Sequence, residues 1–279
     1  MKSNVKRLFA GPYILWMIGF TIIPLLLIVY YGLTTKSGTF TLANVCSIAT
    51  PEHLKALLLS LGLSLAATAI CLLLSYPLAL VLRRRGIGAG SFMVFVFILP
   101  MWMNFLLRTM AWQTLLEKNG VINSILSFVH LPALEIINTP GAIILGMVYN
   151  FLPFMVLPIY VSIEQLDTRL LEAASDLGAK PLTAFRKVTL PLTMPGIAAG
   201  TILVFISSLG MFVVPDVMGG AKSALIGNLI QNQFLSARDW PFGSALSIVL
   251  AVLSLVLIIL YYKALQAQEG GDGDAKDVA

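Results

Sequence analysis

The chain has 279 residues, of which 58% are hydrophobic and 11% are charged, and its mean hydropathy is +0.91. Soluble domains carry about 25% charged residues, so this composition excludes a water-soluble globular protein and indicates an integral membrane protein. The net charge of +5 does not indicate nucleic-acid binding, because the basic residues flank apolar segments and form no basic domain of their own.

Six uncharged segments are each long enough to cross a membrane as a helix. About 20 helical residues, rising about 1.5 Å each, span a hydrocarbon core of about 30 Å. Backbone groups in lipid must hydrogen-bond within their own segment, so the predicted fold class is an all-α integral membrane protein. The segments are Leu8–Thr35, Ala56–Leu82, Gly86–Leu107, Ile136–Ile163, Val188–Pro215 and Pro241–Tyr262.

The distribution of Lys and Arg predicts the orientation, because these residues are enriched on the cytoplasmic side. With the N-terminus inside, twelve of them fall on the inner side: Lys2, Lys6, Arg7, Arg83, Arg84, Arg85, Arg169, Lys180, Arg186, Lys187, Lys263 and Lys276. Five fall in outer loops: Lys36, Lys55, Lys118, Lys222 and Arg238. Both termini are therefore predicted to be cytoplasmic. The tail 266–279 is rich in Gly and Asp without apolar periodicity, and is expected to be disordered.

A polar loop, residues 164–191, separates the fourth and fifth apolar segments. Asp167 is a candidate N-cap of a short helix. Gly178 stands just after the expected end of that helix, at a position where the backbone commonly adopts a positive φ. Apolar residues recur on one face of that helix: Leu170, Leu171, Ala174 and Leu177. Pro181 can begin a second short helix. Leu190 and Pro191 are expected to turn the chain back into the membrane.

The residues alone leave two interpretations of this loop open. An amphipathic helix on the inner side can lie on lipid headgroups or dock against another protein. Ala173 and Ala174 are small and permit close approach of a partner. Glu172 and Asp176 lie four residues apart, on one face of the helix.

The spacing within the loop is that of a known family. Glu172-Ala173-Ala174, three residues, Gly178, nine residues, Val188, one residue and Leu190-Pro191 resemble the EAA loop of binding-protein-dependent ABC importer permeases. Val188 stands where the family often has isoleucine. The resemblance implies a type I permease fold of six transmembrane helices with a coupling loop between helices 4 and 5. It further implies that a separate ATPase is contacted by Glu172, Ala173, Ala174, Asp176, Gly178, Leu190 and Pro191.

Other segments resemble the spermidine/putrescine permease branch of that family, and the resemblance extends from Leu54 to Tyr262. They are Asn119–Asn123, Leu152–Tyr160, Pro191–Gly196, Met218–Lys222 and Arg238–Pro241. The resemblance implies one permease domain over residues 1–279, with a membrane core of about 8–265, in the bacterial inner membrane. It implies a polyamine substrate, a second homologous permease as heterodimer partner, two ATPase subunits and an external solute-binding protein. The chain itself would be no enzyme and hold no cofactor, with ATP and Mg²⁺ on the ATPase.

Two charged residues are predicted at similar depth near the outer interface, namely Arg108 after the third segment and Asp216 after the fifth. A charge in lipid is costly, so the two could pair. Alternatively, Asp216 attracts a cationic solute, assisted by the aromatic face of Trp102 or Tyr149. The sequence leaves both interpretations open.

A secondary transporter and an intramembrane enzyme are the alternatives. Secondary transporters commonly place ionisable groups at mid-membrane, whereas all six segments are uncharged, and His53 and His130 fall in outer loops. The chain has no His-Glu-x-x-His motif and no nucleophile with a recognisable base. Ser60, Ser64 and Ser75 are therefore interpreted as helix-packing residues.

Overall fold

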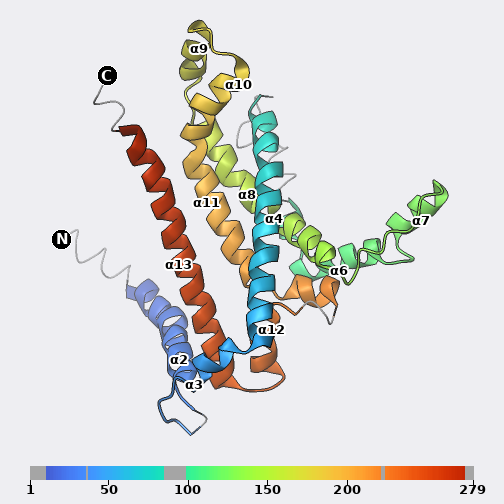
Figure 1. Ribbon diagram of the computed structural model, residues 1–279, viewed down its shortest axis with the longest axis vertical. Coiled ribbons are helices and arrows are strands. Elements are labelled where there is room, and N and C mark those ends of the chain that lie inside the picture. Colours follow the sequence, from blue (N-terminus) through green and yellow to red (C-terminus); the bar gives the residue numbers. More distant parts are fainter. Residues whose placement is uncertain (1–10, 36, 85–98, 221–223, 274–279) are drawn as a thin grey trace. The chain divides into compact units, whose positions relative to one another are not determined.

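The computed structural model describes residues 11–35, 37–84, 99–220 and 224–273 (Figure 1). Within these ranges the regular elements are helices, apart from one isolated bridge between Thr34 and Phe40. The all-α fold class is confirmed.

Five helices in the described ranges are long and apolar enough to cross a membrane: Gly11–Gly32, Pro51–Arg83, Pro140–Glu164, Pro181–Leu209 and Trp240–Lys263. They correspond to five of the six predicted segments. None of residues 11–31 is buried, although this stretch is almost entirely apolar, so its surface suits lipid rather than water.

The remaining predicted segment, Gly86–Leu107, lies mostly outside the described residues. Its described end is not one continuous helix, because the 3₁₀ turn η3 (Leu99–Trp102) stops before Asn104. The Oδ1 atom of Asn104 accepts hydrogen bonds from the backbone N–H groups of Leu106 and Leu107, and thereby caps a new helix, α6 (Phe105–Leu116).

Contacts group the chain into two units, each built from separate stretches of sequence: Met1–Lys55 with Leu229–Tyr262, and Ala56–Asn228 with Lys263–Ala279. The first unit contains η1 (Ile18–Ile22), α2 (Ile23–Gly32), α3 (Ala43–Cys46), η2 (Ser47–Ala49) and most of α13 (Trp240–Gly273). Gly32 permits close packing of α2 on α13, because a Cβ there would lie 2.5 Å from the Cδ1 atom of Ile248. The ring of Tyr31 meets that of Trp240 edge to face at 6.1 Å.

The C-terminal part of α13 differs from the expectation for the tail. Disorder was expected from Gln266, but α13 continues to Gly273. The residues Gln266–Glu269 are good helix formers without proline, so they extend the preceding membrane helix. Residues 274–279 lie outside the described part of the chain.

The second unit holds most of α4 (Pro51–Arg84), α6, α7 (Val121–Phe128), α8 (Pro140–Glu164), α9 (Thr168–Asp176), α10 (Pro181–Ala184), η4 (Phe185–Thr189), α11 (Leu190–Leu209) and η5 (Pro215–Gly219), with α12 (Ile226–Leu235) beginning there. Figure 1 shows α8 and α11 side by side, with α9 and α10 at one end of the pair. Small residues on α11 permit this contact. A Cβ at Gly196 would lie 2.6 Å from the carbonyl oxygen of Pro158, and one at Gly200 2.9 Å from the Met155 sulfur. The spacing Gly-x-x-x-Gly is typical of close helix pairs in membranes.

Candidate functional site

The loop predicted to couple to an ATPase contains the short helix α9, and the N-terminus of this helix is capped as the sequence predicts. The side chain of Asp167 accepts a hydrogen bond from the backbone N–H of Arg169 at 2.9 Å. Of the residues expected to contact a partner, Glu172, Ala173 and Asp176 are exposed, and Ala174 is partly buried. The cap therefore fixes where the helix starts and leaves its predicted contact residues accessible.

The end of α9 is a Schellman motif centred on Gly178. The N–H of Gly178 donates to the carbonyl of Ser175 at 2.9 Å, and the N–H of Ala179 donates to the carbonyl of Ala174 at 3.0 Å. Gly178 has φ +77°, as the sequence predicts. A Cβ there would meet nothing within 4 Å, so the requirement for glycine is conformational rather than steric.

The return of the chain into the membrane differs from the expected turn at Leu190 and Pro191. The reversal occurs at residues 177–180, and a continuous helix then runs from Pro181 to Leu209 through α10, η4 and α11. Pro191 cannot donate a backbone hydrogen bond. The π-helical turn η4, immediately before α11, alters the bonding pattern there and lets the helix continue through the proline.

Buried polar and aromatic contacts join this return helix to α4. The hydroxyl groups of Tyr76 and Thr193 lie 2.9 Å apart, and Thr193 also donates to the carbonyl of Thr189 at 2.9 Å. Because a hydroxyl has one proton, Tyr76 is the donor to Thr193. The ring of Tyr76 also meets that of Phe185 edge to face at 5.6 Å. Thr193 is fully buried, so η4 and the start of α11 are held firmly against α4.

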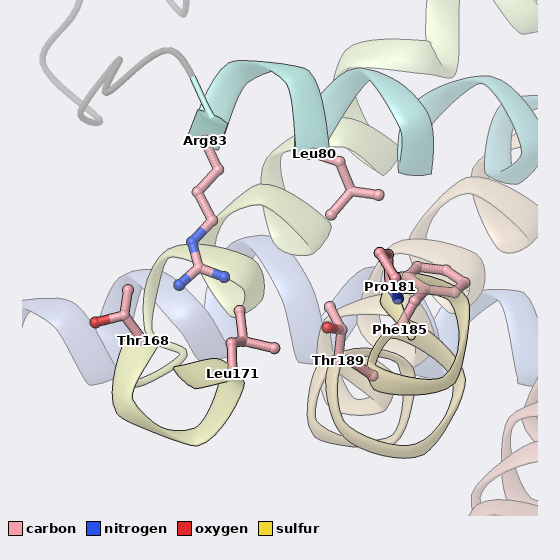
Figure 2. Close-up of a pocket in the computed structure, with 8 residues that line it drawn as sticks. Leu80, Arg83, Thr168, Leu171, Pro181, Phe185 and Thr189 are labelled. Carbon is pink, nitrogen blue, oxygen red and sulfur yellow. The ribbon is translucent and has the colours of Figure 1, made fainter. Parts of the chain in front are cut away.

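A second connection joins the end of α4 to the start of the loop. The Nη2 atom of Arg83 donates to the carbonyl oxygen of Leu166 at 2.9 Å. A cavity of about 360 Å³ lies beside this bond (Figure 2). It is lined by Leu80, Arg83, Thr168, Leu171, Pro181, Ala184, Phe185 and Thr189. The loop is therefore tied to α4 at both its ends.

Apolar side chains project from the loop without cover. Leu170 is 47% exposed, Leu177 89% and Leu182 68%. The predicted apolar face of α9 is only partly covered by its own chain, through Leu171 and Ala174. Exposed leucines beside small alanines form a surface that suits another protein, as docking of a partner requires.

At the other candidate site, Arg108 is buried among aromatic rings. Its guanidinium carbon lies 5.7 Å from the ring centroids of both Phe105 and Tyr149. Tyr149 also contacts Trp112 edge to face at 5.0 Å. The ring of Tyr149 was predicted to bind a cationic solute, but it contacts the guanidinium group of Arg108.

Asp216 lies exposed in η5 and accepts a hydrogen bond from the Nδ2 atom of Asn228. Asn228 is buried and also donates to the carbonyl of Phe212 at 2.9 Å. The role of this asparagine was not predicted from the sequence, because an isolated polar residue in a short helix gives little signal. Trp102 is 76% exposed.

Comparison with known proteins gives consistent results. The family described as "Binding-protein-dependent transport system inner membrane component" matches residues 90–268. The spermidine/putrescine transport system permease protein PotB of Haemophilus influenzae is 43% identical over 272 residues, which cover 95% of each chain. PotB of Escherichia coli K12 is 42% identical over 257 residues, covering 89% of this chain and 94% of that protein.

A solved structure shares the fold. It is a bacterial alginate ABC transporter in complex with a periplasmic protein bound to an alginate pentasaccharide, and one chain matches with a TM-score of 0.73 at 18% identity. The match covers 93% of each chain. The helical architecture, the family match and the PotB relatives agree that this chain belongs to the inner membrane component family of binding-protein-dependent transport systems.

Proposed function

We propose that the chain is the membrane-spanning permease subunit of an ATP-binding-cassette importer that carries polyamines of the spermidine and putrescine class. The observation that carries the proposal is the coupling loop, an exposed helix with uncovered leucines between two membrane helices. The polyamine class is supported by the PotB relatives, which match along nearly their whole length.

The partners follow from the same assignment. ATP is hydrolysed, with Mg²⁺, on two separate ATPase subunits, one of which receives α9. A second homologous permease completes the passage, and an external solute-binding protein delivers the polyamine. This chain contributes the passage and the transmission of movement, and the protein is a multi-pass component of the inner membrane.

The proposal is tested by uptake into proteoliposomes that contain the reconstituted complex of permeases and ATPases. Labelled spermidine and putrescine should enter only with ATP and the binding protein present, and a panel of other amines measures selectivity. A complex with a catalytically inactive ATPase serves as the control. Uptake driven by an ion gradient without ATP would contradict the proposal and favour a secondary transporter.

The proposed orientation places the coupling loop inside and residue 37 outside. Cys46 and Cys71 are free thiols, so both are replaced first to give a cysteine-free background. We then expect an impermeant thiol reagent added to intact cells to label Ser37→Cys and not Asp176→Cys. Permeabilised cells that lack the ATPase subunits should label both, because both positions are exposed in the chain alone. Labelling of Asp176→Cys alone in intact cells would reverse the orientation.

Asp216 is proposed to attract the cationic solute near the outer mouth. We expect Asp216→Asn to assemble normally, because an amide oxygen at this position still accepts the hydrogen bond from Asn228. Polyamine uptake should fall by up to about fivefold, since an exposed ion pair contributes up to about 1 kcal/mol. ATPase activity without the binding protein should stay unchanged.

Arg108 provides the contrasting variant in this experiment. Arg108→Gln removes a buried side chain that lies against two rings, so it should lower the amount of assembled complex. If instead Asp216 has a structural pairing with Arg108, both single variants should lower assembly and the double variant should recover part of it. Normal assembly together with normal uptake in Asp216→Asn would contradict both ideas.

A further inference from the structure

The cavity beside the coupling loop has a polar side and an apolar side. Figure 2 shows the guanidinium of Arg83 directed towards Thr168 and Leu171. The remaining apolar residues that line the cavity lie on the opposite side. That apolar side is formed by Leu80, Pro181 and Phe185. The volume of about 360 Å³ falls within the range of ligand sites, about 300–1,000 Å³.

The guanidinium of Arg83 has donors to spare. Its bond to the carbonyl of Leu166 uses one of five N–H groups. Among the residues that the structure describes, Arg83 makes no ion pair with a carboxylate. A half-buried cation of this kind favours an anion in the cavity, and a planar guanidinium suits the oxygens of a phosphate.

We propose that this cavity binds an anionic phospholipid, with its phosphate on Arg83 and Thr168 and its glycerol and first acyl carbons along the apolar side. The inference rests on the proposed function, because it takes the loop to be cytoplasmic. Arg83 is the last residue of the apolar span Pro51–Arg83, and basic residues at the ends of membrane helices reach the lipid headgroups. Basic pockets between membrane helices on that side commonly hold anionic headgroups. A free anion would leave the apolar side unused.

A lipid bound there contacts two parts that must move together. Leu80 and Arg83 belong to α4, whereas Thr168 and Leu171 belong to α9, the helix proposed to dock on the ATPase. The lipid therefore adds a second link between α4 and the loop, beside the hydrogen bond from Arg83 to the carbonyl of Leu166. Anionic lipid should consequently raise the ATPase rate that the loaded binding protein stimulates.

The experiment uses the whole complex of permeases and ATPases, with phosphatidylglycerol as the probe. Retained lipid is counted by native mass spectrometry, and stimulated ATPase activity is measured in neutral bilayers with and without phosphatidylglycerol. Four variants are compared. Arg83→Gln removes the charge, Arg83→Lys keeps it, and Ala184→Trp fills the apolar side while leaving Arg83 intact. Lys263→Gln removes an exposed cation elsewhere and serves as the control.

We expect Arg83→Gln to lower the affinity for phosphatidylglycerol about fivefold, the effect of one basic residue on an anionic lipid, and Arg83→Lys to keep most of it. Ala184→Trp should also lose the lipid, and Lys263→Gln should behave as wild type. The ATPase should co-purify with every variant, which shows that the loop is folded. Stimulation by phosphatidylglycerol should require about fivefold more of the lipid in Arg83→Gln and should disappear in Ala184→Trp.

Three outcomes would overturn the inference. Equal lipid retention in wild type, Arg83→Gln and Ala184→Trp would show that the cavity holds no lipid. Complete displacement of the lipid by inorganic phosphate would assign the site to a free anion instead. Loss of the lipid in Lys263→Gln to the same extent would indicate a general surface-charge effect. Uptake assays separate these outcomes from the proposed function, which fails only if ATP-dependent uptake is missing in every lipid mixture.

Discussion

Gly196→Leu should greatly reduce the amount of folded permease, because it forces apart α8 and α11, the pair of helices that flanks the proposed coupling loop. A Cβ at Gly196 would lie 2.5 Å from the Cβ of Ser162 and 2.6 Å from the carbonyl oxygen of Pro158. The second of these atoms belongs to the backbone of α8 and cannot rotate away. Overpacking a close-packed contact costs about 1–3 kcal/mol and sometimes more. The measurement is the yield and melting temperature of the permease in detergent.

Gly62→Leu is the matched control for this prediction. Gly62 is also a glycine within a membrane helix, but a Cβ there would meet nothing within 4 Å, so the yield should stay near wild type. A second variant tests the contact directly. Gly196→Ala adds the colliding Cβ alone and should lower the yield less than Gly196→Leu, and Ser162→Gly in the same chain removes one of the two colliding groups and should restore part of the loss. Equal yields for Gly196→Leu and Gly62→Leu would show that α8 and α11 do not pack through this glycine.

The helices and the loop termini were predictable because they depend on local chemistry. Long uncharged segments predict membrane helices, and five of them appear in the described residues. Asp167, Gly178 and Pro181 act at the ends of short helices through their own backbone preferences. The spacing of Gly196 and Gly200 was also visible in the sequence, but it does not reveal which helix packs against them.

The contacts that support the loop were not predictable, because they join residues far apart in sequence. Tyr76 and Thr193 are separated by 117 positions. Arg83 bonds to a backbone carbonyl, and any residue at position 166 supplies one. The expected turn at Leu190 and Pro191 was wrong for a related reason. Proline commonly ends a helix, but the π-helical turn before it accommodates the missing donor, and this turn has no clear sequence signature.

Gly178→Val should leave the permease in the membrane and abolish most of its association with the ATPase. Gly178 holds φ +77° and makes the Schellman hydrogen bond to Ser175. A β-branched residue in this left-handed region costs about 1–2 kcal/mol. The loop can escape that cost by leaving the motif, which changes the direction of α10 relative to α9. A change of 1–2 kcal/mol corresponds to about a five- to thirtyfold shift between the two loop conformations. Co-purification of the ATPase and stimulated ATPase activity are the measurements.

Gly178→Asn is the control that isolates the backbone conformation, since asparagine adopts positive φ more readily than valine and should retain most of the association. Glu172→Lys tests the docking face instead. Glu172 is exposed on α9, so reversing its charge should leave the fold of the loop intact and weaken docking alone. The two variants therefore differ in a proteolysis assay of the isolated permease: Gly178→Val should become more sensitive within the loop, and Glu172→Lys should not. Wild-type co-purification of the ATPase with both variants would refute the assignment of this loop as the docking element.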